Sequence, residues 1–402
     1  MASTAAVGTA PVGYSSDVLR DLLAHIDAGV IDREQQERPP HAEFALLKQA
    51  RIGALRLPRH EGDAGAALVE LFATVIDLGE VDPNVAHSLR NHYQFVERLL
   101  RRPDPANEEW FAHVRAGRLF GLAATELSNA KAGRRQQDFA TKVTRTDQGL
   151  RLSGEKYYST GNLYADLLVV AAADVDGEAT QLAVPVDRPG VEIPNDWDGI
   201  GQRFTGSGTT RFTNTPVYES DVIGGSPYGD IPYPATFPQL YLTAVIAGVQ
   251  RRIARDAASL VRAKQRTFYH SPSDQPTKDP ILQQTVGELA SQAFIAEAAV
   301  LVAAAALQEA TEAHGSCDEP DLALRAALKA SKAKVVVDEL ALRAAGELFD
   351  VGGGQGVRRS SHLDRHWRNI RTLAAHNPRT YKARAIGAYE IDGTPLPNGA
   401  FF

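Results

Sequence analysis

Residues 364–378 read DRHWRNIRTLAAHNP, and this stretch decides how the rest of the chain is interpreted. Its first part has helical period, and it ends at His376-Asn377-Pro378. A general base has to lie within reach of the proton that it removes. No Asp or Glu occurs between Thr372 and Ala388. The segment therefore offers His and Asn where a carboxylate base would otherwise be sought.

The segments that precede this stretch are long, rich in alanine and of helical period. They cover residues 240–264, 280–314 and 320–348, with breaks at Ser271-Pro272, Gly315-Ser316 and Gly352-Gly353-Gly354. We predict that residues 233–402 form a C-terminal four-helix-bundle domain. The most apolar run, residues 298–307, is too short to span a bilayer, so we expect no membrane role.

The residue pattern changes from helical periodicity to short alternating runs near residue 119. Residues 1–118 predict an N-terminal helical domain, in which Ser16-Asp17 caps a helix and Asp82-Pro83 separates two others. From Phe120 to Val222 short apolar or alternating runs are separated by turns such as Asp147-Gln148-Gly149. We predict a middle antiparallel β domain over residues 119–232, and an α+β fold for the whole chain.

Composition excludes several classes of protein. The chain has 402 residues and a formal net charge of −6, whereas nucleic-acid binders usually carry a basic stripe. The single cysteine, Cys317, cannot form an internal disulfide, which fits a cytoplasmic protein without a secretory signal. His362 and His366 have a metal-ligand spacing, but no third ligand lies beside them, so we expect no metal.

Four separated motifs resemble those of the acyl-CoA dehydrogenase superfamily. They are Ala124-Thr125-Glu126, GEKYYSTG at 154–161, GQRFTGSGTT at 201–210, and LFDVGG at 348–353 leading into 364–369. The resemblance implies an acyl-CoA dehydrogenase-like fold with the three domains predicted above. In the superfamily's dehydrogenases a Glu near residue 376 removes the substrate's α-proton, and this chain departs from that pattern.

Within the superfamily the chain is similar to the flavin-dependent monooxygenase branch, which includes dibenzothiophene monooxygenase and the sulfur-acquisition oxidoreductases. The shared features are the Ser-Thr-Gly strand end, Asn195-Asp196-Trp197 and the final His-Asn-Pro. The resemblance implies that a separate reductase supplies reduced FMN, with FAD as the alternative cofactor. Oxygen then adds at flavin C4a, and the hydroperoxide oxygenates a small, apolar organosulfur, amine or aromatic substrate.

The same resemblance assigns catalytic roles to three residues. Thr160 aligns with the branch's catalytic Ser, and neighbouring side chains on a strand point to opposite faces; we therefore expect Thr160 rather than Ser159 to reach flavin N5 or the peroxide. His376 is expected to protonate or orient the peroxide. His92 either faces the flavin or is satisfied in the core. His87 is left out, because five residues along a helix place it off the face of His92.

Other residues are expected to hold the cofactor. Arg262 and Arg266 share a helix face and either reach the flavin phosphate of a neighbouring subunit or are solvated. Gly353 lies in a turn that ends a helix and lets backbone approach a cofactor across a subunit interface. The full set of cofactor-binding candidates is Thr125, Ser159, Trp197, Arg262, Arg266, Gly353, Gln355 and Arg371.

Assembly and two alternatives complete the prediction. Sharing of flavin sites implies a homotetramer or a dimer of related geometry. The first alternative is an acyl-CoA dehydrogenase-type oxidoreductase with tightly bound FAD, and the second is a non-catalytic binding protein on the same fold. The aromatic residues Tyr228, Tyr233, Phe237 and Tyr241 either line an apolar pocket or pack in the core.

Overall fold

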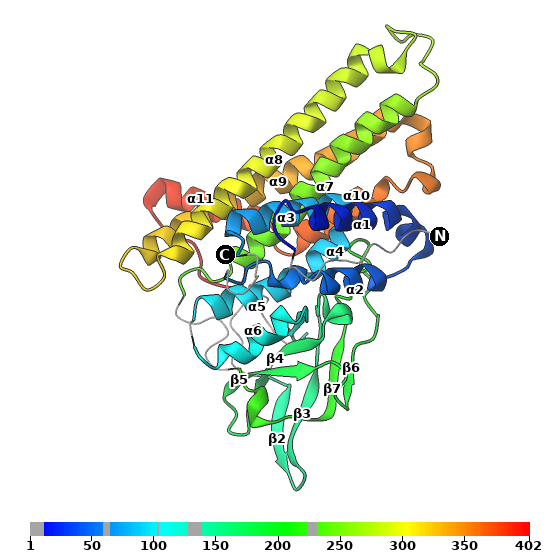
Figure 1. The fold of residues 1–402 in the computed structure, drawn as a ribbon. Helices are drawn as coiled ribbons and strands as arrows, with labels where there is room; N and C mark the ends of the chain where they lie inside the picture. The colour runs from blue at the N-terminus through cyan, green and yellow to red at the C-terminus, as the bar shows by residue number, and fades with distance from the viewer. Residues whose placement is uncertain (1–11, 59–64, 103, 128–138, 224–230) are drawn as a thin grey trace.

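The computed structural model describes the chain except for residues 1–11, 59–64, 103, 128–138 and 224–230. Its helices lie on one side of a curled sheet, and one end of the helical layer projects away from that sheet (Figure 1). The predicted order of helices, strands and helices is confirmed.

The N-terminal region is helical, as predicted. Its elements are α1 (Asp17–Gln36), α2 (His41–Gln49), η1 (Ile52–Ala54), α3 (Leu68–Val81), α4 (Pro83–Ser88), α5 (Arg90–Leu100) and α6 (Asn107–Arg115). Ser16 caps α1, because its Oγ accepts from Leu19 N at 3.2 Å. Asp82 caps α4 by accepting from Asn84 N at 2.9 Å, and Pro83 occupies the first turn, where no amide hydrogen is needed.

The middle region is a seven-stranded sheet. Its strands are β1 (Phe120–Ala123), β2 (Lys142–Thr146), β3 (Gly149–Lys156), β4 (Leu167–Ala173), β5 (Ala179–Pro185), β6 (Val191–Glu192) and β7 (Thr210–Pro216), with η2 (Asn162–Tyr164) and η3 (Glu219–Asp221) between them. The order is β1-β4-β2-β3-β7-β6, and β5 pairs with β4. The predicted antiparallel sheet is correct for most pairs, but β1–β4 and β2–β4 are parallel.

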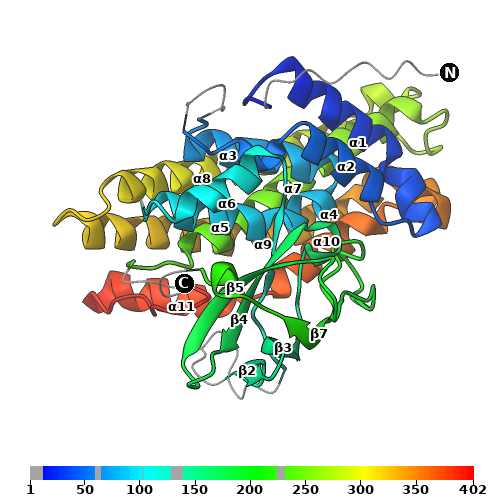
Figure 2. The ribbon, with the colours of Figure 1, turned by 60° about the horizontal axis from the view of Figure 1, so that its bottom comes forward.

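The C-terminal region contains three long helices and two shorter ones. They are α7 (Thr236–Ala263), α8 (Pro280–Glu312), α9 (Glu319–Gly356), α10 (Asp364–Ala375) and α11 (Arg379–Asp392), with η4 (Pro276–Lys278) and η5 (Arg359–Ser361) between them. Helices α10 and α11 both pack against α9 and lie below the long helices in Figure 2. Sequence analysis did not predict α11. The predicted boundary between residues 232 and 233 falls just before α7.

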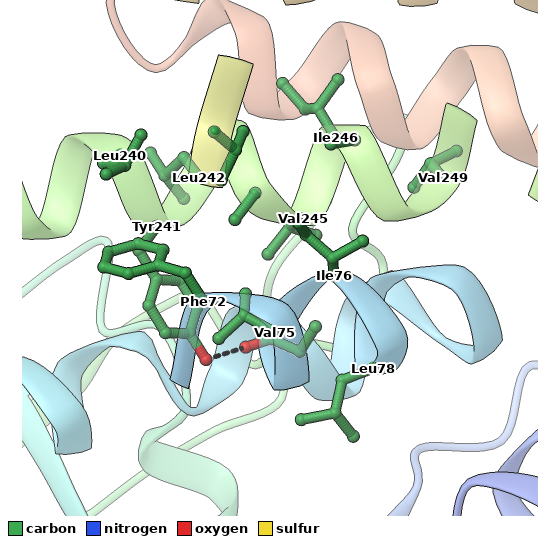
Figure 3. Packing of buried hydrophobic residues seen from close by; sticks show 14 of the residues in the cluster. Phe72, Val75, Ile76, Leu78, Leu240, Tyr241, Leu242, Val245, Ile246 and Val249 are labelled. Carbon is green, nitrogen blue, oxygen red and sulfur yellow. Dashed lines mark hydrogen bonds between the residues drawn. The ribbon is translucent and has the colours of Figure 1, made fainter. Parts of the chain in front are cut away.

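Helices α3 and α7 join the first and last regions into one core. Phe72, Val75 and Ile76 of α3 pack against Tyr241 and Val245 of α7 (Figure 3). Glycines let the two backbones touch: a Cβ on Gly79 would lie 2.7 Å from Val245 O, and one on Gly248 would lie 2.3 Å from Ile76 O. The N-terminal helices are therefore part of the same core as the bundle.

The aromatic residues of α7 belong to this core. Phe237 and Tyr241 are buried beside Phe72, and the Tyr241 hydroxyl donates to Ala86 O at 2.9 Å. Tyr233 is half-buried and donates to Leu396 O. Tyr228 lies outside the described residues. Of the two interpretations offered by the sequence, core packing is correct for Phe237 and Tyr241.

Helix α8 carries an exposed apolar face. By length and composition it could cross a membrane, although 44% of its most apolar window is buried inside the bundle, and core helices of globular proteins pass the same test. The prediction that this region is too short to span a bilayer considered only residues 298–307, and the helix is longer. Phe294 and Val302 are 70% and 55% exposed.

Candidate active site

The end of strand β3 is held in an unusual backbone conformation. Tyr157 N donates to Thr125 O at 2.9 Å, after which Tyr158 adopts a positive φ of 56°. Gly161 has a φ of 88°, and its N donates to Thr205 O at 2.8 Å. Glycine is suited to this position because its conformation disfavours a side chain.

The strand end rests directly on helices α4 and α5. A Cβ on Gly161 would lie 2.3 Å from Ser88 O, so the two backbones are in contact. Asn91 Nδ2 donates to Thr160 O at 2.8 Å. These contacts fix residues 159–161 against the junction of the two helices.

The two hydroxyls of the strand end have different surroundings. Thr160 Oγ1 is 2.8 Å from Ser207 Oγ, which is 2.7 Å from Thr205 Oγ1. Ser159 Oγ is buried and has no hydrogen-bond partner among the described residues. A hydroxyl already held in a chain of hydroxyls is less available to a ligand than one without a partner. The contacts therefore favour Ser159 as the hydroxyl that reaches the flavin, whereas the sequence predicted Thr160 for this role.

Two other predicted cofactor residues border the same strand end. Thr125 follows β1, and its carbonyl accepts from Tyr157 N as described above. The Trp197 ring packs edge-on against Tyr158 with centroids 6.2 Å apart, and its buried Nε1 has no partner in the described part of the chain. The structure therefore brings Thr125, Ser159 and Trp197 together.

A histidine that the sequence analysis omitted lies at this junction. His87 Nδ1 is 3.0 Å from Gln202 Oε1, and Gln202 N donates to Asn369 Oδ1 at 2.7 Å. Burial, assisted by nearby Arg90, lowers the pKa of His87 to about 3, so the ring is neutral. Counting along one helix excluded it, but α4 ends at Ser88 and α5 begins at Arg90. Helical geometry does not apply across that break.

His376 reaches the same junction from the C-terminal region. It follows α10, and Arg90 Nη1 lies 3.4 Å from its Nε2. Phe401 packs edge-on against the ring, with centroids 5.5 Å apart. His376 as a whole is exposed in the single chain, but desolvation of its ring and the charge of Arg90 lower its pKa well below its ordinary value. Arg can only donate, so Nε2 is assigned as the acceptor and the proton of the neutral ring lies on Nδ1.

His92 has a structural position instead. Its Nε2 is 3.0 Å from Gly53 O, and its Nδ1 accepts from Phe120 N at 3.1 Å. Both ring nitrogens are thus used to join η1 to β1. Burial lowers its pKa to about 4. Of the two interpretations in the sequence analysis, the core histidine fits these contacts.

The remaining cofactor candidates lie elsewhere. Helix α7 ends at Ala263 and Lys264 is extended, so Arg266 does not share a helix face with Arg262; that prediction was wrong. Gly353 has a φ of 57° and lies at a kink of α9, where one helical stretch ends and the next begins, which agrees with the predicted turn. A Cβ on Gly353 would lie 3.9 Å from Lys264 Nζ, which places the ends of α7 and α9 side by side.

These candidates gather at the end of the bundle that projects away from the sheet (Figure 1). Arg262, Arg266 and Gln355 are exposed there. Arg371 lies on α10 and interacts electrostatically with Asp338. Within one chain the structure therefore separates the candidates of the strand end from those of the bundle end.

Several buried polar atoms around the strand end and His376 lack partners among the described residues. They are His87 Nε2, Arg90 Nε, Ser159 Oγ, Trp197 Nε1, Gln202 Nε2 and Asn377 Oδ1. Unpaired buried polar atoms are costly, so a concentration of them indicates a place where a polar ligand binds. No group of three or more His, Cys, Asp or Glu that could hold a metal occurs in the described ranges.

Comparison with known proteins agrees with this geometry. Residues 240–379 match the family model "Acyl-CoA dehydrogenase, C-terminal domain". A probable FMNH2-dependent monooxygenase, SfnC from Pseudomonas putida, is 28% identical over 95% of this chain and 96% of its own length. Residues 240–379 therefore form an acyl-CoA dehydrogenase C-terminal domain. Over nearly its full length the chain is similar to flavin-dependent monooxygenases.

One further relative is similar in sequence, and two solved structures are similar in fold. Dibenzothiophene monooxygenase from Mycolicibacterium goodii is 27% identical over 96% of this chain and 95% of its own. The structure of methanesulfinate monooxygenase MsuC from Pseudomonas fluorescens has a TM-score of 0.83, with 26% identity over 96% of this chain and 98% of that one. FMN-bound TdsC from Paenibacillus sp. A11-2 has a TM-score of 0.85 at 24% identity, over 96% and 99% of the two chains, and shows the shared fold.

Proposed function

We propose that this protein is a two-component flavin-dependent monooxygenase that uses reduced FMN and O2 to oxygenate a small organosulfur substrate. A separate reductase supplies the reduced flavin. The relatives named as FMNH2-dependent, dibenzothiophene and methanesulfinate monooxygenases support the activity. The observation that carries the proposal within this chain is the buried Ser159 hydroxyl without a partner.

The residues of the strand end fit a flavin. A flavin ring offers hydrogen-bond donors and acceptors along one edge and a flat apolar face. Ser159 Oγ can both donate and accept, and Trp197 Nε1 can donate. When bound, reduced FMN supplies two of the electrons that reduce O2 while one oxygen atom enters the substrate.

Each residue of the site has a distinct task in this proposal. The Ser159 hydroxyl would hydrogen-bond to the bound flavin. Thr160 fixes the strand end, because its hydroxyl contacts Ser207 and its carbonyl accepts from Asn91. His376 moves a proton at its Nδ1. Phe401 packs edge-on against the same ring, which is otherwise exposed in the single chain. Oriented donors in a dry site stabilise developing charge more strongly than water does.

The absence of Asp and Glu between Thr372 and Ala388 argues against the dehydrogenase alternative, which needs a carboxylate base. Assembly as a homotetramer or a related dimer is part of the proposal. Arg262, Arg266, Gly353 and Gln355 would then contact the cofactor of a neighbouring subunit. The exposed apolar face of α8 supports assembly, since large exposed apolar patches commonly mark protein contacts.

The Ser159→Ala and Thr160→Val variants test this assignment. With chemically reduced FMN, O2 and a sulfide, Ser159→Ala should lower the oxygenation rate on the order of 100-fold and convert flavin reoxidation to hydrogen peroxide release, since one oriented donor is typically worth that much. Thr160→Val removes the bond to Ser207 and should lower the melting temperature with a smaller loss of product per flavin oxidised. Normal coupling in Ser159→Ala would refute the role of Ser159. No oxygenation by the parent with any sulfide, sulfinate or amine would refute the function.

A further inference from the structure

Two cations beside His376, the half-buried Arg90 and the buried Lys382, have no carboxylate partner in the described part of the chain. Arg90 Nε is buried without a hydrogen-bond partner among the described residues, and Nη1 of the same side chain lies 3.4 Å from His376 Nε2. Lys382 is 3% exposed; its Nζ donates to Phe401 O and lies 4.0 Å from the centroid of the Phe402 ring. The positive charges of both side chains help to lower the pKa of His376.

Two arginines that are more deeply buried than Arg90 are paired with carboxylates. Arg33 binds Asp82 at 2.9 Å and Arg365 binds Asp256 at 3.0 Å. Arg98 lacks a carboxylate, but its guanidinium donates to Gln181 Oε1 and packs on the Phe95 ring. For Arg90 the acceptor is a ring nitrogen of His376, which carries no negative charge to offset the cation. A buried cation without an anion is costly, and such groups are usually paired.

The surroundings of His376 are positive overall. Lys334 is paired with Asp338 at 2.6 Å, and Arg379 is paired with Glu339 at 2.9 Å. These carboxylates are therefore already used. Burial and the charge of Lys334 lower the pKa of Lys382 to about 7, and burial lowers the pKa of Arg90 to about 10. An anion placed between these groups would reverse both shifts, because an opposite charge favours the protonated forms.

We propose that Arg90, His376 and Lys382 bind the anionic head group of the substrate, and that this head group is a sulfinate or a similar small oxyanion. The inference rests on the proposed function and names its substrate class. It replaces the apolar substrate that the sequence analysis expected. Arg suits this task because its planar fork donates two parallel hydrogen bonds to an oxyanion.

The reaction balances for a sulfinate. R–SO2⁻, reduced FMN and O2 become R–SO3⁻, oxidised FMN and water. Sulfur loses two electrons and gains one S–O bond, and reduced FMN gives two electrons and two protons. The second oxygen atom leaves as the water. The positive cluster binds substrate and product alike through their common charge.

Methanesulfinate and dimethyl sulfoxide form a matched pair of probes, since they are close in size but differ in charge. Arg90→Gln and Lys382→Met should each raise the KM for methanesulfinate by roughly 10- to 100-fold, as expected for a lost hydrogen bond to a charged group. The KM for dimethyl sulfoxide should rise by a much smaller factor than that for methanesulfinate, and circular dichroism checks that the variants are folded. Arg90→Lys should recover part of the loss by keeping the charge.

Binding gives a readout that is independent of turnover. Calorimetric titration of the FMN-loaded parent with methanesulfonate should show binding that weakens in Arg90→Gln, while the affinity for reduced FMN stays unchanged. A weakened affinity for reduced FMN with an unaltered KM for methanesulfinate would assign the cations to the flavin and overturn the inference. Turnover of neutral sulfides without any preference for methanesulfinate would also overturn it, and would leave the proposed monooxygenase function standing.

Discussion

Replacing Gly161 with alanine should both destabilise the protein and impair the site. Gly161 has a φ of 88°, a conformation that costs an alanine roughly 1–2 kcal/mol. The added Cβ would lie 2.3 Å from Ser88 O, at least 0.7 Å inside the 3.0 Å limit that real Cβ atoms respect. Forcing the strand end away from α4 adds about 1–3 kcal/mol of overpacking. We expect a total loss of roughly 2–5 kcal/mol.

Gly177 provides a matched control. It has the same φ of 88°, but a Cβ there would meet nothing within 4 Å. Gly177→Ala should therefore lose only the backbone part, about 1–2 kcal/mol. Urea unfolding followed by circular dichroism measures both variants, and product per flavin oxidised should fall in Gly161→Ala alone. Equal losses of unfolding free energy in the two variants would refute the contact with Ser88 as the cause.

Two further predictions concern assembly and acid stability. Phe294→Asp on the exposed face of α8 should lower the molecular mass measured by light scattering at micromolar concentration. The control Ile391→Asp should not, although Ile391 on α11 is 86% exposed. A monomeric and fully active parent would contradict shared flavin sites. Burial lowers the pKa of His87 to about 3 and those of His92 and His366 to about 4, so their contribution to stability is present above pH 6.5 and is lost as the pH falls toward 4. Urea unfolding from pH 7.5 to 4.5 should show this loss, and His92→Gln should reduce the slope by up to one proton, about 1.4 kcal/mol per pH unit; an unchanged slope would contradict the buried neutral state of His92.

Local signals in the sequence predicted most element boundaries. Ser16 and Asp82-Pro83 begin helices through bonds that span only a few residues, and the turn before Gly149 joins β2 to β3. Such features need no information about distant parts of the chain. The order of the three regions follows from the same short-range patterns.

The site was harder to predict because its geometry depends on breaks in regular structure. The resemblance favoured Thr160, and alternation along a strand then directed Ser159 to the opposite face. Strand β3 ends at Lys156 and Tyr158 has a positive φ, so alternation no longer applies. Helical spacing excluded His87 for a similar reason, since two helices meet beside it. The contact of Arg90 with His376 joins positions 286 residues apart, and no local pattern shows it.

The glycine crossing of α3 and α7 has a consequence for synthesis on the ribosome. Gly79 and Gly248 are 169 positions apart, as the difference of their numbers shows. At about 5–20 residues per second, α3 emerges roughly 10 to 30 s before the helix that covers it. During this interval the β2–β3 and β4–β5 hairpins can form from neighbouring segments. The apolar side chains of α3 meanwhile remain uncovered, which makes the nascent N-terminal region a natural client for a chaperone.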